Sequence, residues 1–150
     1  MSQSYESAPQ APPGPPPGGP SGPRANFGQR LAGYLIDAIL TGVVVVILYY
    51  ISTVLYLLGV VGVIAYWVVL VGNARGQTVG MMALNIRVVD TQTGGPIGYG
   101  RSFLRLLMMW IGSIPLYLGW FWMLWDPQKQ TWHDKVANTF VVPADAYPRQ

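Results

Sequence analysis

Residues 31–71 read LAGYLIDAILTGVVVVILYYISTVLYLLGVVGVIAYWVVLV, and this stretch decides the fold. It is 41 residues long and carries one charge, that of Asp37. One helical crossing of a bilayer takes about 20 apolar residues, so two helices joined by a tight turn fit this length. Val and Ile favour strands in water, but lipid requires every backbone group to be satisfied locally and thereby selects helix.

The turn between the two helices is expected at Ser52 and Thr53, which are polar residues with tyrosines on either side. Tyrosine side chains concentrate at the level of the lipid headgroups, so these tyrosines indicate one end of the crossing. We therefore expect a first helix over about 28–50 and a second over about 54–72.

The composition agrees with a membrane environment. The chain of 150 residues is 51% apolar and 10% charged, whereas an ordinary soluble domain is about 25% charged. A net charge of +3 spread along the chain lacks the concentrated basic face of nucleic-acid-binding proteins. The absence of Cys and the presence of one His, His133, argue against a thiolate or histidine metal site. We expect the lipid bilayer as surroundings, and no cofactor, metal or nucleic acid.

Residues 1–26 hold eight of the thirteen prolines and four glycines, and they contain too few apolar residues to form a core. We expect a disordered cytoplasmic tail that favours extended polyproline II, either as a spacer or as a docking strip for a protein partner. No cleavable secretory signal is recognised at its start, so a retained helix has to direct the chain to the membrane.

Residues 73–101 carry glycine, threonine and four charges, so this stretch leaves the membrane. Residues 84–90 have the composition of a strand, and residues 91–96 supply a turn. This pattern in a small cytoplasmic loop is compatible with a short β-hairpin at the membrane surface.

A third apolar segment, 103–125, contains Arg105 near its start and Pro115 at its middle. Because proline breaks a helix, the segment is either one kinked spanning helix or a re-entrant pair of half-helices. A spanning segment leaves six Lys and Arg on the cytoplasmic side and three outside, whereas re-entry places all nine inside. The positive-inside rule favours re-entry, and both alternatives stay open. The expected fold class is an all-α membrane protein with two transmembrane helices and this third, proline-broken segment.

Asp37 lies about two turns inside the first helix, where an ionised carboxylate costs on the order of 3 kcal/mol at the bilayer centre. Arg30 lies seven residues before it, within about 20° of the same helix face. Such a polar stripe faces other helices and not acyl chains. Asp37 is then either part of a buried ion pair that fixes packing or a cation or proton site. Its candidate ion-pair partners are Arg30, Arg101 and Arg105.

The stretch 125–142 is dense in polar groups for so apolar a chain. Thr131 is placed to cap a short helix. His133 next to Asp134 invites a general-base interpretation, but no Ser or Cys signature surrounds the pair, so we do not expect an enzyme. The alternative is that Asp134 pairs with an arginine of the loop or of the first helix, with His133 at the interface.

Three features together resemble the RDD family of small bacterial membrane proteins, named for one arginine and two aspartates. They are Arg30 seven residues before Asp37, GQTVG at 76–80 followed by IRVVD at 86–90, and WHDKVANTFVV at 132–142. By motif match the family charges are Arg30, Asp37 and Asp134. Met81 stands where many members have lysine, and Asn138 stands where glycine is common.

The resemblance divides the chain into a tail at 1–26, an RDD-like transmembrane domain at 27–142 and a C-terminal tail at 143–150. The proline-rich lead resembles the actinobacterial proline-rich antigen type of the family. Some members have been linked to ion transport, and others are parts of larger membrane assemblies. The resemblance thus implies a multi-pass plasma-membrane protein with a cytoplasmic N-terminus.

Two functions follow as hypotheses. One is an ion or small-solute transport component that uses the charges of Arg30 and Asp37. The other is a structural or scaffolding membrane protein that recruits partners through its proline-rich tail. In either case a homo-oligomer or a larger membrane complex is expected, because two helices and a broken third segment shield few polar groups.

Overall fold

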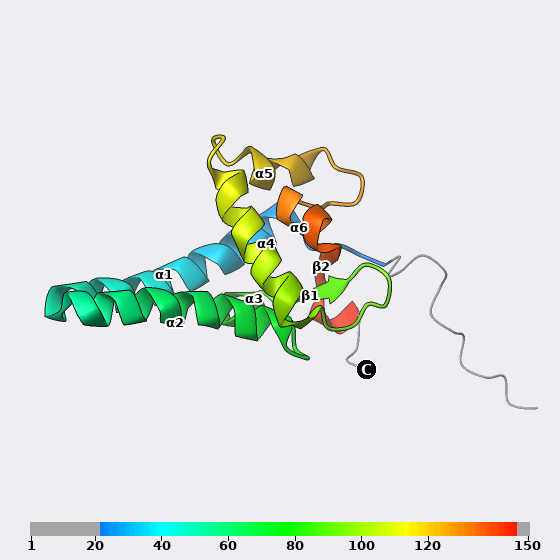
Figure 1. Ribbon diagram of the computed structural model, residues 1–150. Coiled ribbons are helices and arrows are strands. Elements are labelled where there is room, and N and C mark those ends of the chain that lie inside the picture. The colour runs from blue at the N-terminus through cyan, green and yellow to red at the C-terminus, as the bar shows by residue number, and fades with distance from the viewer. Residues whose placement is uncertain (1–21, 147–150) are drawn as a thin grey trace, which may run out of the picture.

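The computed structural model describes residues 22–146, and two long antiparallel helices dominate it (Figure 1). These are α1 (Phe27–Ile51) and α2 (Thr53–Gly72), and both are long and apolar enough to cross a membrane. Few of their side chains are buried, as expected of helices whose surroundings are lipid. The two helices predicted from the apolar stretch are confirmed.

A single residue forms the turn of this hairpin. Ser52 has extended backbone angles, and its N–H donates to the carbonyl of Leu48 at the end of α1. Its hydroxyl oxygen accepts the N–H of Val54 at 3.2 Å and so caps α2. Because the same serine forms hydrogen bonds with the last turn of α1 and the first turn of α2, the chain reverses direction without a loop.

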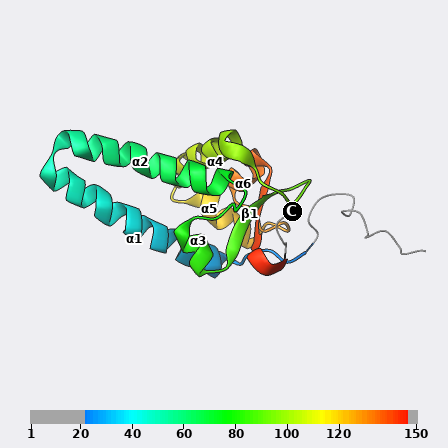
Figure 2. The ribbon, with the colours of Figure 1, turned by 90° about the horizontal axis from the view of Figure 1, so that it is seen from below.

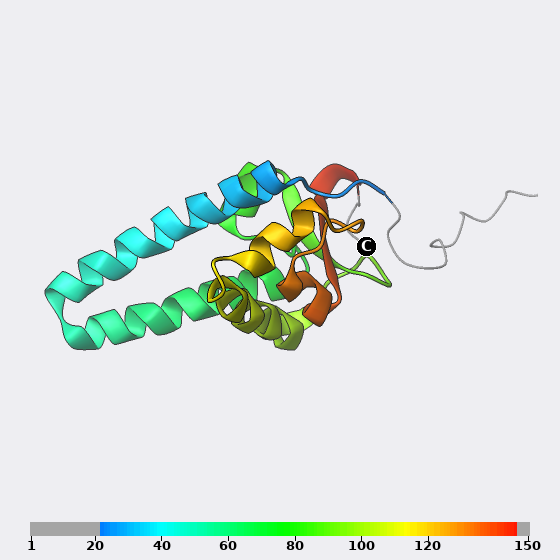
Figure 3. The same ribbon diagram turned by 90° about the horizontal axis from the view of Figure 1, so that it is seen from above.

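The other elements gather at the opposite end of the hairpin, and we call residues 73–146 the head (Figure 1). Figures 2 and 3 show α1 and α2 diverging as they approach the head. The elements of the head are α3 (Val79–Ala83), β1 (Ile86–Asp90), α4 (Gly98–Ser113), α5 (Leu118–Phe121), the 3₁₀ helix η1 (Trp122–Leu124), α6 (Trp132–Ala137), β2 (Thr139–Pro143) and the 3₁₀ helix η2 (Ala144–Ala146).

The strand expected within residues 84–90 is present as β1, but the expected β-hairpin is wrong in its second strand. β1 pairs antiparallel with the distant β2, from Ile86 opposite Pro143 to Asp90 opposite Thr139. The turn at 91–96 leads instead into α4. Residues after that turn are rich in glycine, whereas β2 has the β-branched and aromatic residues that strands favour.

Both edges of this two-stranded sheet are covered by other backbone. The N–H of Val88 donates to the carbonyl of Gly76 at 2.8 Å, and the N–H of Ala25 donates to the carbonyl of Val141 at 2.9 Å. Gly76 has φ +64°, and a Cβ there would lie 2.4 Å from the oxygen of Val88, so this edge contact requires glycine. The sheet therefore has no free edge at its centre.

Ala25 belongs to the stretch expected as tail, yet it is fully buried at the sheet edge. The guanidinium of Arg24 lies 3.7 Å from the ring centroid of Phe140. The packed domain thus extends back to these residues, and the remainder of the expected tail, 1–21, lies outside the described residues, as do 147–150 of the expected C-terminal tail.

The third apolar segment is broken as its proline predicts. α4 begins at Gly98, earlier than expected, and ends before Pro115, after which the chain turns by 113° into α5 and η1. Leu116 and Tyr117 in the break have φ of 52° and 59°. β1 precedes this segment and β2 follows it, so the strand pairing brings its two ends together.

Two apolar clusters hold the head against the hairpin. One lies under the sheet and the other lies where α4 and α5 meet α2. The first contains Ala25, Val71, Ile86, Val88, Ile97 and Val141, and the second contains Trp67, Leu106, Met109 and Trp120.

The long-range strand pairing can be tested with engineered disulfides in a chain that has no cysteine. Val88 and Val141 are opposite each other in the two strands. The N–H of Val88 and the carbonyl of Val141 form hydrogen bonds outside the strand pair, with Gly76 and Ala25, so the two valines are a non-hydrogen-bonded pair. Such non-hydrogen-bonded pairs have Cα atoms about 4.5 Å apart, which suits a disulfide. Val88→Cys with Val141→Cys should therefore cross-link on oxidation, measured by the mass of a linked peptide pair.

The control is Val89→Cys with Val141→Cys, because adjacent residues of a strand point to opposite faces. Equal cross-linking of both pairs, or none of either, would contradict the register.

Candidate functional site

The carboxylate of Asp134 is the centre of a buried ionic cluster. Asp134 is fully buried on α6, and its Oδ2 lies 2.5 Å from Nη2 of Arg30 on α1. Its Oδ1 accepts from Nε and Nη2 of Arg105 on α4, at 3.0 and 2.8 Å. One side chain thus joins the first helix, the third apolar segment and the C-terminal helix, which are far apart in sequence.

The remaining acceptor positions of this carboxylate are also filled. Thr131 donates its N–H and its hydroxyl to Oδ2, at 3.1 and 2.8 Å, and Thr139 donates its hydroxyl to Oδ1 at 3.3 Å. Thr131 caps α6 as expected, in a capping box with Asp134. The carboxylate therefore keeps no free lone pair for a ligand.

Burial alone would raise the pKa of Asp134, but the charges of Arg30 and Arg105 outweigh it and hold the pKa well below its usual range. Asp134 is therefore ionised at neutral pH. Two arginines and one aspartate leave the cluster with one net positive charge. Removing one partner of such a cluster leaves a buried charge unpaired and is strongly destabilising.

His133 contributes no charge to this cluster. Its side chain is buried against Trp120, with ring centroids 5.4 Å apart, and its Nε2 lies 3.9 Å from Oδ1 of Asp134. Burial lowers the pKa of His133 well below its ordinary value, so the ring is neutral at pH 7. A small cavity of about 20 Å³ lies between His133 and the arginines.

The second family aspartate, Asp37, is fully buried on α1 but has no arginine partner. Its Oδ1 accepts the hydroxyl of Tyr66 at 2.6 Å and the N–H of Gly80 at 2.8 Å. Its Oδ2 accepts the hydroxyl of Thr78 at 2.5 Å. Asp37 is thus bound by neutral hydrogen-bond donors from α2 and from the N-terminal end of α3, and not by an ion pair.

The expectation that Arg30, Arg101 or Arg105 pairs with Asp37 is therefore wrong for the described residues. Arg30 and Arg105 bind Asp134, and Arg101 pairs with Asp90 at the surface of the head. Arg30 and Asp37 share a helix face but lie about 10 Å apart along the axis, so a direct pair requires the arginine to fold back along its own helix.

A glycine in α3 allows the donors to reach Asp37. A Cβ on Gly80 would lie 2.0 Å from the carbonyl oxygen of Gly33, so only glycine permits this approach of α3 to α1. Thr78 caps α3 by accepting from Met81 while its hydroxyl donates to Asp37. The GQTVG motif therefore shapes a loop that binds the aspartate of the first helix.

Sequence reasoning missed Tyr66, Thr78 and Gly80 as the partners of Asp37. The motif drew attention to the loop, but no spacing linked it to a position about forty residues earlier. Asn138 shows why glycine is common at its position: it ends α6 with φ 51° in the left-handed region, which glycine adopts most readily.

The cluster is suited to holding helices together. Within residues 22–146 there is no group of three or more His, Cys, Asp and Glu side chains that could hold a metal ion. The three family charges lie in two separate hydrogen-bonded centres, Arg30 with Asp134 and Asp37 apart from both.

Comparison with known proteins identifies the family of the chain. The model of the RDD family matches residues 24–138. A proline-rich antigen homolog of Mycobacterium tuberculosis is 38% identical over 86 residues, which cover 55% of this chain and 36% of the relative. The proline-rich antigen of Mycobacterium leprae is 32% identical over 71 residues, or 47% of this chain and 28% of the relative. The chain thus spans about a third or less of the length of these relatives. No solved structure matches it.

Replacing Asp134 by Asn should lower the free energy of unfolding by about 3–5 kcal/mol, because Arg30 and Arg105 are left buried without a counter-charge. The measurement is denaturant unfolding of the purified chain in detergent, followed by tryptophan fluorescence.

The matched control is Arg101→Gln, which breaks the ion pair of a side chain that is 37% exposed. This change should cost less than about 1 kcal/mol, as exposed ion pairs do. Similar losses for the two variants would show that Asp134 does not hold the helices.

Proposed function

Because the chain belongs to the RDD family of membrane proteins, we propose that it is a scaffold that anchors its head and its proline-rich tail at the membrane and catalyses no reaction of its own. The observation that supports this most is that Arg30, Asp37 and Asp134 are all engaged by partners inside the chain. Buried charged groups that are hydrogen-bonded inside the chain fix the arrangement of helices and leave few positions for a substrate.

The proposed topology is a multi-pass plasma-membrane protein with both described ends in the cytoplasm. β1 and β2 flank residues 98–124 in sequence and pair with each other, which favours a topology with both ends of that segment on one side of the bilayer. This supports re-entry over spanning. The positive-inside rule supports a cytoplasmic head, since residues 38–74 carry no charge and every Lys and Arg lies outside them.

Labelling of single cysteines tests this topology. With Thr53→Cys, a membrane-impermeant maleimide should label intact cells, because the hairpin turn lies outside. With Ser7→Cys or Ala144→Cys, labelling should require permeabilised cells. Labelling of Ala144→Cys in intact cells would establish a spanning third segment and overturn the proposed topology.

The proposed partners are a second copy of the chain and a cytoplasmic protein that binds the tail. The face of the hairpin between Leu40 and Gly62 is apolar and holds a groove of about 260 Å³, which favours packing against another helix. The tail holds Ala-Pro-Pro-Gly-Pro-Pro-Pro, a sequence that aromatic-lined grooves of other proteins recognise in extended form.

Transport remains the second candidate, and one observation favours it. Tyr34 and Trp67 line the small cavity that Arg30 and Arg105 also line. The same two residues line a larger apolar groove beside the hairpin. These two aromatic side chains therefore separate a charged space from one that faces lipid.

Cross-linking and flux measurements distinguish the two functions. In native membranes the full chain should form adducts with itself and with a cytoplasmic protein, and deletion of residues 1–21 should abolish only the second adduct. Reconstituted in liposomes, the full chain should carry no cation or proton flux above protein-free liposomes.

A flux that is lost in Asp37→Asn would support transport and contradict the scaffold. Survival of the heterologous adduct after the deletion would remove the proposed role of the tail.

A further inference from the structure

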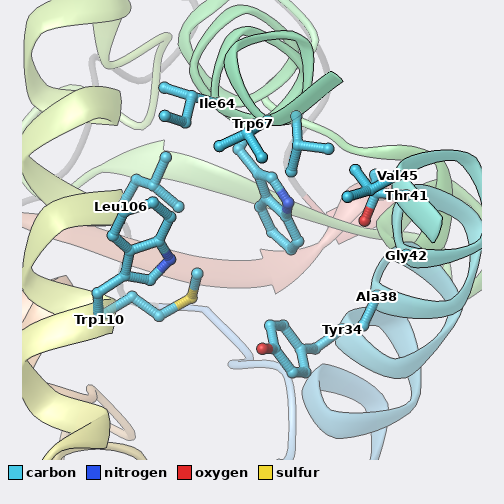
Figure 4. A pocket seen from close by; sticks show the side chains of 12 residues that line it. Tyr34, Ala38, Thr41, Gly42, Val45, Ile64, Trp67, Leu106 and Trp110 are labelled. Carbon is cyan, nitrogen blue, oxygen red and sulfur yellow. The ribbon is translucent and has the colours of Figure 1, made fainter. Parts of the chain in front are cut away.

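A groove of about 320 Å³ lies where α1 and α2 diverge and α4 closes the gap (Figure 4). This volume is within the range of about 300–1,000 Å³ that is typical of small-molecule sites. Its walls come from all three helices and are mostly aliphatic or aromatic. The lining residues include Tyr34, Gly42 and Val45 of α1, Val60 and Trp67 of α2, and Trp110 of α4.

One end of the groove carries hydrogen-bond donors without acceptors. Within the described residues no acceptor is bonded to the hydroxyl of Tyr34 or to the indole N–H of Trp67 or Trp110. Trp67 is only 9% exposed, and Figure 4 shows its ring and that of Tyr34 projecting into the space between the helices. Trp110 is 53% exposed, and none of these three donor atoms is among the fully buried ones, so they open on the groove. A donor that faces hydrocarbon has no water to bond, so an acceptor supplied by a ligand in the groove is favoured.

The other end of the groove is apolar and lies deeper along the hairpin. Tyr34 and Val45 are eleven residues apart on α1, or about 16 Å along the helix axis. Val60 faces the same end from α2. The groove is thus elongated, with donors near the head and aliphatic walls toward the hairpin turn.

The donor end also borders positive charge. Tyr34 and Trp67 lie between the groove and the small cavity that Arg30 and Arg105 line. The ionic cluster at that cavity has one net positive charge. An electron-rich group at this end is therefore favoured electrostatically.

We propose that this groove binds one acyl chain of a membrane phospholipid, with the ester carbonyl oxygen at Tyr34, Trp67 and Trp110 and the chain running toward Val45 and Val60. A phospholipid fits because the groove continues the exposed apolar surface of α1 and α2, which is in contact with lipid. The long axis, the apolar deep end and the donors at one end match the shape and polarity of an ester-linked chain. This site does not depend on the scaffold function or on the tail.

Gly42→Leu tests the site without disturbing the fold. A Cβ on Gly42 meets no atom within 4 Å, so the new side chain enters the groove, and leucine favours helix more than glycine does. The matched control is Gly62→Leu, whose Cβ also meets nothing within 4 Å but which lines the groove on the other face of the hairpin.

The probe is a phosphatidylcholine with a diazirine in one acyl chain, diluted into vesicles of unlabelled phosphatidylcholine that contain the full chain. After illumination, the adducts are located by mass spectrometry of peptides. We expect adducts at Val45 and Val60 in the wild type and in Gly62→Leu, and at least a tenfold lower yield there in Gly42→Leu.

The donors are tested with Trp110→Phe, which keeps the aromatic wall and removes one N–H, against Trp125→Phe, which lies outside the groove. Adducts at the groove should fall several-fold in the first variant only. Equal yields in Gly42→Leu and Gly62→Leu, or adducts spread evenly over exposed residues such as Ile39, would overturn the site. Cross-links from Val45 to a second copy of the chain would also overturn it, because a helix then fills the groove.

Discussion

The pairing of one buried carboxylate, that of Asp134, with Arg30 and Arg105 is the interaction on which the arrangement of this domain depends. It links three helices drawn from the beginning, the middle and the end of the domain. A buried ion cluster adds little net stability compared with apolar packing, but removing one of its members strongly lowers the free energy of unfolding. Its effect is therefore to exclude arrangements in which α1, α4 and α6 lie apart.

The two family aspartates are stabilised in different ways. Asp134 lies in the head, where arginines from two helices reach it and hold it ionised. Asp37 lies farther along α1 and is met by neutral donors, two hydroxyls and one amide N–H. One carboxylate thus attaches α1 to α4 and α6, and the other attaches it to α2 and the start of α3. Together they orient the hairpin relative to the head.

The features that could be predicted from the sequence are those set by one stretch of chain at a time. The apolar run gave both membrane helices, because length and hydropathy decide whether a helix fits lipid. Pro115 indicated the break in the third segment, and the β-branched residues of 86–90 indicated a strand.

The features that depended on distant contacts could not be predicted. The partner of β1 comes from about fifty residues later, and a strand pattern does not say which strand it pairs with. Likewise, the helical spacing of Arg30 and Asp37 suggested that the two form an ion pair, whereas in the folded chain Arg30 pairs with Asp134. The donors to Asp37 depend on Gly80, which allows the backbone of α3 to contact that of α1 at Gly33, and no local pattern reveals this contact.

A double-mutant cycle between Arg105 and Asp134 tests the central claim most directly. The free energy of unfolding is measured for the wild type, Arg105→Met, Asp134→Asn and the double variant in the same detergent. The ionic cluster predicts a coupling energy of more than about 1 kcal/mol, because the second change removes a group that the first has already left unpaired. Losses that add to within about 0.5 kcal/mol would show that the two side chains act independently and would contradict the account.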